Sequence, residues 1–266
     1  MHSLLEHGLI ALDGMLVQSF HVMDVSLAQE VDMHVWALVV LVLLVGWTII
    51  GADRYPRMKE KLRNGDRLAL LRMYRTTIAG QIVMAGCAVI GIQSRLFTTP
   101  ALAGGSYGGY AAWGALGLGA VLVLAIVLAR LRHRDSDPEV PIVGDIRDLI
   151  PRTQEERLWF LGVALCAGVC EEILFRGFGF YGLHLLGLPY GVIWLVDGLL
   201  FGCAHLYQGL RGMVGTAVMG IVFAIIFSLT GILIFGMILH FALDARLTLI
   251  PASWLGPKRR QQNDPL

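Results

Sequence analysis

Four long runs without Lys, Arg, Asp or Glu constrain this 266-residue chain more than any other feature. An apolar run of about 18 residues is long enough to cross a bilayer as a helix. Charged residues make up 15% of the chain, against about 25% in soluble domains, so few side chains can face water. The sequence therefore predicts a polytopic membrane protein and excludes a disordered, collagen-like or disulfide-stapled secreted protein. The runs cover Val35–Ala52, Thr76–Ser94, Leu96–Ala129 and Gly212–Leu243.

The second half of the chain contains further apolar segments that single charges interrupt. Only helices satisfy all backbone groups inside lipid at these lengths, so we expect helical spans here too. The predicted fold is an all-α polytopic membrane helical bundle with about seven transmembrane helices. Pro189 and Pro251 are expected at helix boundaries, and Thr230 with Gly231 at a tight turn. The later spans are expected at Glu155–Gly182, Tyr190–Gln208, Arg211–Leu229 and Gly231–Pro251.

Basic residues are distributed unevenly along the chain. Eight Lys or Arg lie in Arg54–Arg75 and six in Arg130–Arg157, whereas residues 1–33 contain none. Basic loops of membrane proteins stay in the cytoplasm. We therefore expect a multi-pass protein of the cytoplasmic membrane, with its N-terminus outside and its C-terminus inside.

Ionisable side chains at membrane depth are costly, which makes them candidates for function. A rise of 1.5 Å per helical residue places several of those in the second half within one band about 9 Å deep. Three helices can therefore bring carboxylates and imidazoles together. We expect an ion pair between Glu172 and Arg176, which are at i,i+4 spacing, and a helix–helix hydrogen bond for Asp197. The cluster comprises Glu171, Glu172, Arg176, Asp197, His205, His240 and Asp244.

Three short patterns in this cluster resemble a known family. Glu171-Glu172-Ile-Leu-Phe-Arg176 matches EExxxR, Phe201 to His205 matches FxxxH, and His240 to Asp244 matches HxxxN with Asp in the last place. In this order they resemble the motifs of the CAAX protease and bacteriocin-processing (CPBP, or Abi) family of intramembrane endopeptidases. The resemblance covers about Leu158–Pro251.

The resemblance implies an enzyme and assigns roles to its residues. Glu171 would activate the hydrolytic water beside His205 and His240, and Glu172 and Arg176 would orient and neutralise the site. The substrate would be a membrane-associated protein or peptide, cleaved as a prenylated CAAX protein, a leader peptide or a C-terminal sorting tag. Membrane lipid is the other expected partner, nucleic acid is not expected, and the oligomeric state stays open.

The Asp in the last motif leaves the metal question open. An ionised Asp244 only accepts hydrogen bonds, so it can replace an Asn amide as a donor only when protonated. Ionised, it could bind Zn²⁺ together with His205 and His240, with Glu171 as the base. The zincin motif HExxH does not occur in the sequence. We expect a glutamate-type, metal-free mechanism, with a zinc metalloendopeptidase as the alternative.

The chain is expected to have four regions. They are an amphipathic N-terminal segment (1–33), a transmembrane region with basic cytoplasmic loops (34–152), a catalytic membrane domain (153–251) and a cytoplasmic tail (252–266). Two other functions compete with proteolysis. One is a non-catalytic immunity or chaperone-like membrane protein, and the other is a proton-coupled transporter that uses the same side chains as a relay.

Overall fold

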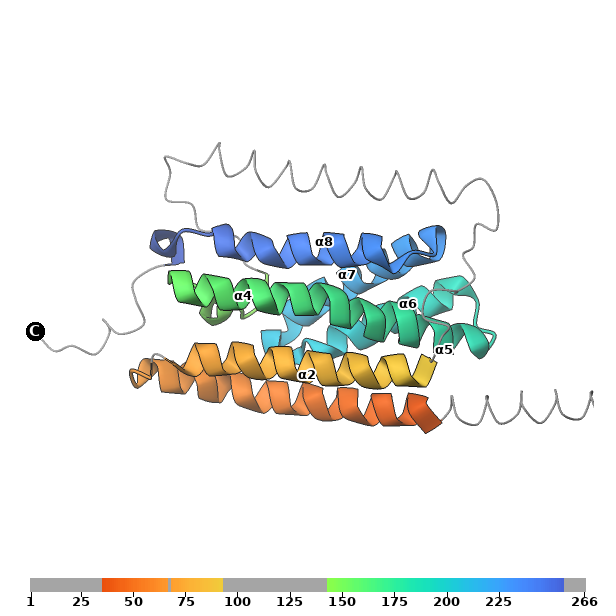
Figure 1. Ribbon diagram of the computed structural model, residues 1–266, viewed down its shortest axis with the longest axis horizontal. Coiled ribbons are helices and arrows are strands. Elements are labelled where there is room, and N and C mark those ends of the chain that lie inside the picture. Colours follow the sequence, from red (N-terminus) through yellow and green to blue (C-terminus); the bar gives the residue numbers. More distant parts are fainter. Residues whose placement is uncertain (1–34, 67, 93–142, 256–266) are drawn as a thin grey trace, which may run out of the picture.

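The computed structural model describes residues 35–66, 68–92 and 143–255, and within them it contains helices and short connections but no strand (Figure 1). The predicted all-α architecture is thus confirmed for this part of the chain. The expected amphipathic segment 1–33, the Leu96–Ala129 span and the end of the tail lie outside the described residues. The main helices are Val35–Arg63, α2 (Ala69–Ile92), α4 (Gln154–Cys166), α5 (Phe180–Leu185), α6 (Tyr190–Ala204), α7 (Gly209–Thr230) and α8 (Leu233–Ala245).

Within the described residues, four helices are long and apolar enough to cross a membrane. The two other principal helices are shorter, with 15 residues in α6 and 13 in α8. The predicted total of seven spans and the orientation of the termini therefore stay predictions. The four long helices are Val35–Arg63, Ala69–Gly91, Gln154–Leu185 and Leu206–Thr230.

Local sequence signals explain several helix boundaries. Thr153 and Glu156 form a capping box at the start of α4, in which each side chain accepts from the other residue's backbone N–H. Pro189 caps α6 in an extended conformation, as predicted. Gly231 ends α7 with a φ of 67°, which glycine adopts at little cost. The expected turn at Thr230 and Gly231 is confirmed.

The long helix Gln154–Leu185 is not α-helical throughout. Between α4 and α5 it contains two π-helical segments, η3 (Ala167–Glu171) and η4 (Ile173–Gly179). We expected one regular span at Glu155–Gly182, and periodicity alone did not indicate the wider turns. π-helical turns occur frequently at functional sites, and these two carry the first sequence motif.

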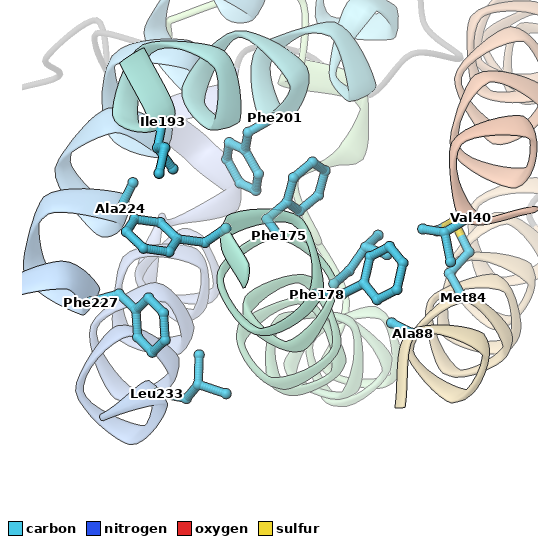
Figure 2. Packing of buried hydrophobic residues seen from close by; sticks show 12 residues of the cluster. Val40, Met84, Ala88, Phe175, Phe178, Ile193, Phe201, Ala224, Phe227 and Leu233 are labelled. Carbon is cyan, nitrogen blue, oxygen red and sulfur yellow. The ribbon is translucent and has the colours of Figure 1, made fainter. Parts of the chain in front are cut away.

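An aromatic core holds the η4 segment between the other helices (Figure 2). Phe175 packs edge-on against Phe201 of α6, with ring centroids 5.0 Å apart. On the other side Phe178 faces Met84 and Ala88 of α2. The segment that carries the first motif is therefore fixed from both sides.

Glycines let α6 and α7 approach closely. A Cβ on Gly198 would lie 2.4 Å from Ile221 Cγ1, and one on Gly202 would lie 2.7 Å from the backbone oxygen of Met213. The GxxxG spacing of Gly198 and Gly202 thus serves helix packing. All four cysteines are free thiols, and Cys203 is exposed on α6.

The basic segments Arg54–Arg75 and 143–157 lie at one end of the bundle, on the left in Figure 1, which we call the basic end. There Lys59 Nζ lies 2.6 Å from Asp145 Oδ2, and the Tyr55 hydroxyl donates to the Asp145 backbone oxygen at 2.5 Å. Arg157 at the start of α4 donates to the backbone oxygens of Thr248 and Ile250, just beyond α8. The end of the first helix and the segment that follows residue 142 are therefore in contact at this basic end.

Candidate active site

Glu171 is the last residue of the π-helical segment η3, and its side chain is 14% exposed. Its Oε1 accepts a hydrogen bond of 2.8 Å from Gln81 Nε2 on α2. Its Oε2 has no hydrogen-bond partner within the described part of the chain. Instead, Oε2 lies 3.9 Å from His205 Nε2 and 3.8 Å from His240 Nε2. One carboxylate oxygen is therefore fixed, and the other faces two imidazoles.

His205 lies directly after the last residue of α6. Its Nδ1 is 2.8 Å from the backbone oxygen of Phe201, one turn earlier in the same helix. A carbonyl oxygen only accepts hydrogen bonds, so Nδ1 carries the proton and Nε2 of the neutral ring is an acceptor. The FxxxH spacing thus turns Nε2 toward Glu171. The helix had been expected to continue to Gln208, but it ends at Ala204, where His205 leaves the α conformation.

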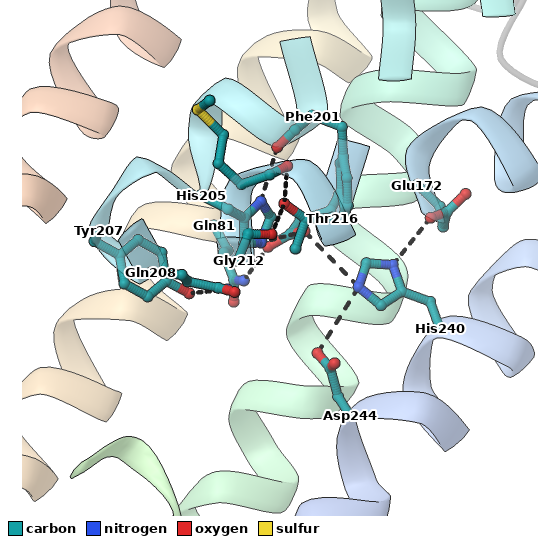
Figure 3. A network of polar contacts seen from close by, with 12 residues as sticks. Gln81, Glu172, Phe201, His205, Tyr207, Gln208, Gly212, Thr216, His240 and Asp244 are labelled. Atoms are coloured by element: carbon teal, nitrogen blue, oxygen red, sulfur yellow. Dashed lines mark hydrogen bonds and ion pairs between the residues drawn. The ribbon is translucent and has the colours of Figure 1, made fainter. Parts of the chain in front are cut away.

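His240 lies on α8 between two carboxylates (Figure 3). Its Nδ1 lies 3.0 Å from Glu172 Oε1, and its Nε2 lies 3.8 Å from Asp244 Oδ2. Gly236 of the same helix provides the room, because a Cβ there would lie 2.8 Å from Glu172 Oε2. The i,i+4 spacing of His240 and Asp244 places both side chains on one face of α8.

Arg176 is fully buried beneath these groups, with 0% of its side chain exposed. Its Nη1 donates to Glu172 Oε1 at 3.2 Å, and its Nη2 donates to the Gly220 backbone oxygen at 2.8 Å. Its Nε lies 3.4 Å from Asp197 Oδ2. The expected pair of Glu172 and Arg176 is therefore present, and Asp197 joins α6 to it as an ion pair instead of the expected simple hydrogen bond.

A cavity of about 390 Å³ contains Glu171, His205, His240 and Asp244 in its lining. The walls are mainly apolar side chains from the first helix, α2, α4 and α7. At the basic end of the bundle the lining includes Arg54, and Arg246 just after α8. The four side chains thus share one space that extends from the interior of the bundle toward its basic end.

Zinc is the alternative that the sequence leaves open for this site. Among the residues that the structure describes, no three His, Cys, Asp or Glu side chains are arranged to hold a metal ion. The metal ligands expected for the alternative mechanism, His205, His240 and Asp244, line the same cavity, and zinc binding stays a prediction.

Every site residue that the sequence singled out takes part in one connected arrangement. Among the cavity residues that the sequence did not single out are Gln81 on α2 and Tyr207 after α6. Tyr207 is ring-packed near His205, with centroids 5.9 Å apart. The signal for Gln81 was an amide in the middle of the apolar run Thr76–Ser94, where polar groups are rare. Nothing in the sequence distinguished Tyr207 from other tyrosines.

Comparison with known families agrees with this arrangement. Residues 153–246 match the family model of type II CAAX prenyl endopeptidases, Rce1-like. The matched segment begins at the N-cap of α4, ends immediately after α8 and includes all three motifs. The family predicted from the motifs is confirmed by this match. Neither the curated proteins nor the solved structures gave a match to the chain.

Proposed function

We propose that the chain is an intramembrane endopeptidase that uses Glu171 to activate water for hydrolysis of a peptide bond. One observation carries the proposal. Glu171 Oε2, without a hydrogen-bond partner in the described structure, faces Nε2 of His205 and of His240 inside a cavity. An unpartnered carboxylate oxygen beside two imidazoles is the arrangement that a general base needs.

The distances leave room for the reacting water. Separations of 3.8 and 3.9 Å are too long for direct hydrogen bonds but allow one water to contact both partners. In the first step the water oxygen forms a bond to the scissile carbonyl carbon, and its proton passes to Glu171 Oε2. In the second step the C–N bond breaks and the leaving nitrogen takes that proton. The products are a carboxylic acid, which keeps the second water proton until it ionises, and an amine, and Glu171 is regenerated.

The two histidines have different roles, one toward the attacking water and the other toward the oxyanion. His205, with its Nδ1 proton held by Phe201, presents an acceptor at Nε2 and helps to orient the attacking water. His240 has Glu172 at Nδ1, and this carboxylate stabilises positive charge on the ring. In that charged form Nε2 of His240 donates to the oxyanion that develops on the substrate.

Asp244 is the departure from the family motif, and in a metal-free site it works as a protonated side chain. Its Oδ2 lies 3.8 Å from His240 Nε2, and both residues line the cavity. A carboxylic acid has one O–H donor, which can support the oxyanion in place of the Asn amide. Zinc bound with the help of Asp244 is the alternative that the experiments below distinguish.

The placement of the cavity supports a cytoplasmic site and a membrane-associated substrate. The basic end of the bundle is cytoplasmic by the positive-inside rule, and the cavity lining includes Arg54 and Arg246 at that end. The apolar walls suit a substrate segment that arrives from the lipid. We therefore propose an enzyme of the cytoplasmic membrane that cuts a protein or peptide of the CAAX, leader or sorting-tag kind.

The experiment that tests the proposal is Glu171→Gln. The amide preserves the shape of the side chain and can still accept from Gln81, but it cannot take a proton from water. Cleavage of a farnesylated CAAX peptide would be measured with the purified wild type and variant. Membranes of cells that contain either protein would also be searched for truncated proteins by mass spectrometry. We expect cleavage by the wild type and loss of roughly 100-fold or more in the variant at equal membrane content.

Two results would overturn the proposal. Turnover by Glu171→Gln at the wild-type rate would show that Glu171 is not the base. Identical peptide products and membrane proteomes with the wild type, with the variant and without the protein would favour the non-catalytic immunity or chaperone-like function.

A further inference from the structure

We infer that Gln81 is a positioning residue of the active site, supplied by the part of the chain that precedes the family match. The inference rests on the proposed function of Glu171. Gln81 lies on α2, whereas the match begins at residue 153. Its role would therefore give the N-terminal region a direct part in catalysis.

The contact between the two side chains is specific and buried. Gln81 is 4% exposed, and its Nε2 donates to Glu171 Oε1 at 2.8 Å across 90 positions of sequence. This orientation of the amide is the one that an ionised carboxylate requires, since the other would set two acceptor oxygens against each other. Gln81 Oε1 itself is buried without a hydrogen-bond partner in the described structure. The amide of Gln81 therefore donates to Glu171 while its own oxygen has no partner there.

The consequence for catalysis concerns which oxygen of Glu171 accepts the proton. With Oε1 occupied by the amide, Oε2 is the oxygen left to face His205 and His240. The hydrogen bond from Gln81 persists when Oε2 is protonated, because Oε1 is then the carbonyl oxygen of the acid. Gln81 thus directs the proton to the oxygen beside the substrate through the whole cycle.

An amide suits this role better than a cation. Lys or Arg at this position would place a positive charge beside Glu171 and weaken the affinity of its carboxylate for a proton. A neutral donor fixes the geometry without adding net charge. The buried cation of this region, Arg176, instead contacts Glu172 and Asp197, which are not the base.

The first test replaces Gln81 with Met, which has similar length and no N–H. A lost hydrogen bond to a charged group and a misdirected base each reduce turnover by tens of fold. We expect kcat of purified Gln81→Met on the farnesylated CAAX peptide to fall roughly 10- to 100-fold, with KM within about twofold of wild type. An unchanged kcat would overturn the inference.

A rescue variant separates positioning from a merely structural role. Gln81→Glu can donate to Glu171 only while it is protonated, and once ionised it opposes the base. The titratable groups near Glu171 in the described structure include His205, His240, Tyr207, Cys170 and, through His240, Asp244, and all of them are unchanged in this variant. We expect the activity of Gln81→Glu relative to wild type to rise as the pH is lowered. A ratio that does not change with pH would contradict the inference.

Ser228→Ala is the matched control for loss of a buried interhelical hydrogen bond. Ser228 accepts from Trp194 Nε1 at 3.0 Å between α7 and α6, and it is not part of the cavity lining. We expect Ser228→Ala to keep the wild-type kcat. An equal loss of kcat in Ser228→Ala and Gln81→Met would mean that general packing is at work and would overturn the inference. Failure of the proposed function would look different, because either Glu171→Gln would remain active or the wild type itself would cleave nothing.

Discussion

Removal of the buried cation should destabilise the bundle more than any change at its surface. Arg176→Met keeps the length of the side chain but removes its charge and its five N–H donors. Glu172 would keep His240 as a partner, at 3.0 Å. Asp197 would keep no cationic partner in the described structure, because its only ion pair there is with Arg176. The perturbation thus leaves one buried carboxylate uncompensated.

The magnitude follows from this burial. Both carboxylates are 1% exposed, so water cannot replace the lost contacts. Breaking a buried ion pair by removing one partner costs about 3–5 kcal/mol. For a chain of this size that corresponds to a fall of roughly 6–20 °C in the melting midpoint. The orientation of His240 should be lost as well, so activity is expected to fall together with stability.

The assay is thermal denaturation of the purified protein in detergent, read by intrinsic fluorescence. Arg57→Met is the matched control, because Arg57 pairs with Asp53 at the same i,i+4 spacing but is 71% exposed. An exposed pair contributes about 0–1 kcal/mol, so its midpoint should move by no more than about 4 °C. Asp197→Asn added to Arg176→Met should recover part of the loss, with a coupling energy of at least about 1 kcal/mol.

The reasoning would be refuted by a particular pattern of midpoints. If Arg176→Met and Arg57→Met lowered the midpoint equally, burial would not control the cost. If Asp197→Asn gave no recovery, the uncompensated carboxylate would not be the cause.

Two further predictions concern the mechanism and the topology. Asp244→Asn should retain turnover, and its turnover should decline less as the pH rises, because the amide donor does not ionise. Stoichiometric zinc in the wild type by plasma mass spectrometry, lost together with activity in Asp244→Asn, would instead establish the metal-dependent mechanism. A reporter that is active only outside the cell should be inactive when fused at Gly65 and active when fused within residues 102–109. The reverse pattern would invert the proposed orientation.

Sequence alone was sufficient for the membrane class and for the choice of candidate site residues. Long uncharged runs predict helices in lipid whatever their partners, because backbone groups in lipid must be bonded within the segment. The cost of burying charge marks Glu171, Glu172, Arg176, His205 and His240 as candidates for function without any structure. Order and spacing of the three motifs then indicated the family, which the match to residues 153–246 confirms.

The local geometry of the motif segments could not be read from the sequence. Two π-helical segments carry Glu171 and Arg176, and hydrophobic periodicity does not distinguish them from regular α-helix in an all-apolar span. The end of α6 at Ala204 was also missed, although it lets His205 present Nε2 to Glu171. In both cases the chain departs from regular α-helix at or next to a residue of the candidate site.

What only the tertiary structure decided is which groups meet across distant segments. Gln81 and Glu171 are 90 positions apart, and no pattern within either helix indicates that they share a hydrogen bond. Asp197 likewise contacts Arg176 because α6 packs beside the η4 segment. Periodicity and composition report the environment of a residue within its own helix. The partner of a polar side chain depends on how helices cross, and that is decided by packing at glycines and aromatic rings far along the chain.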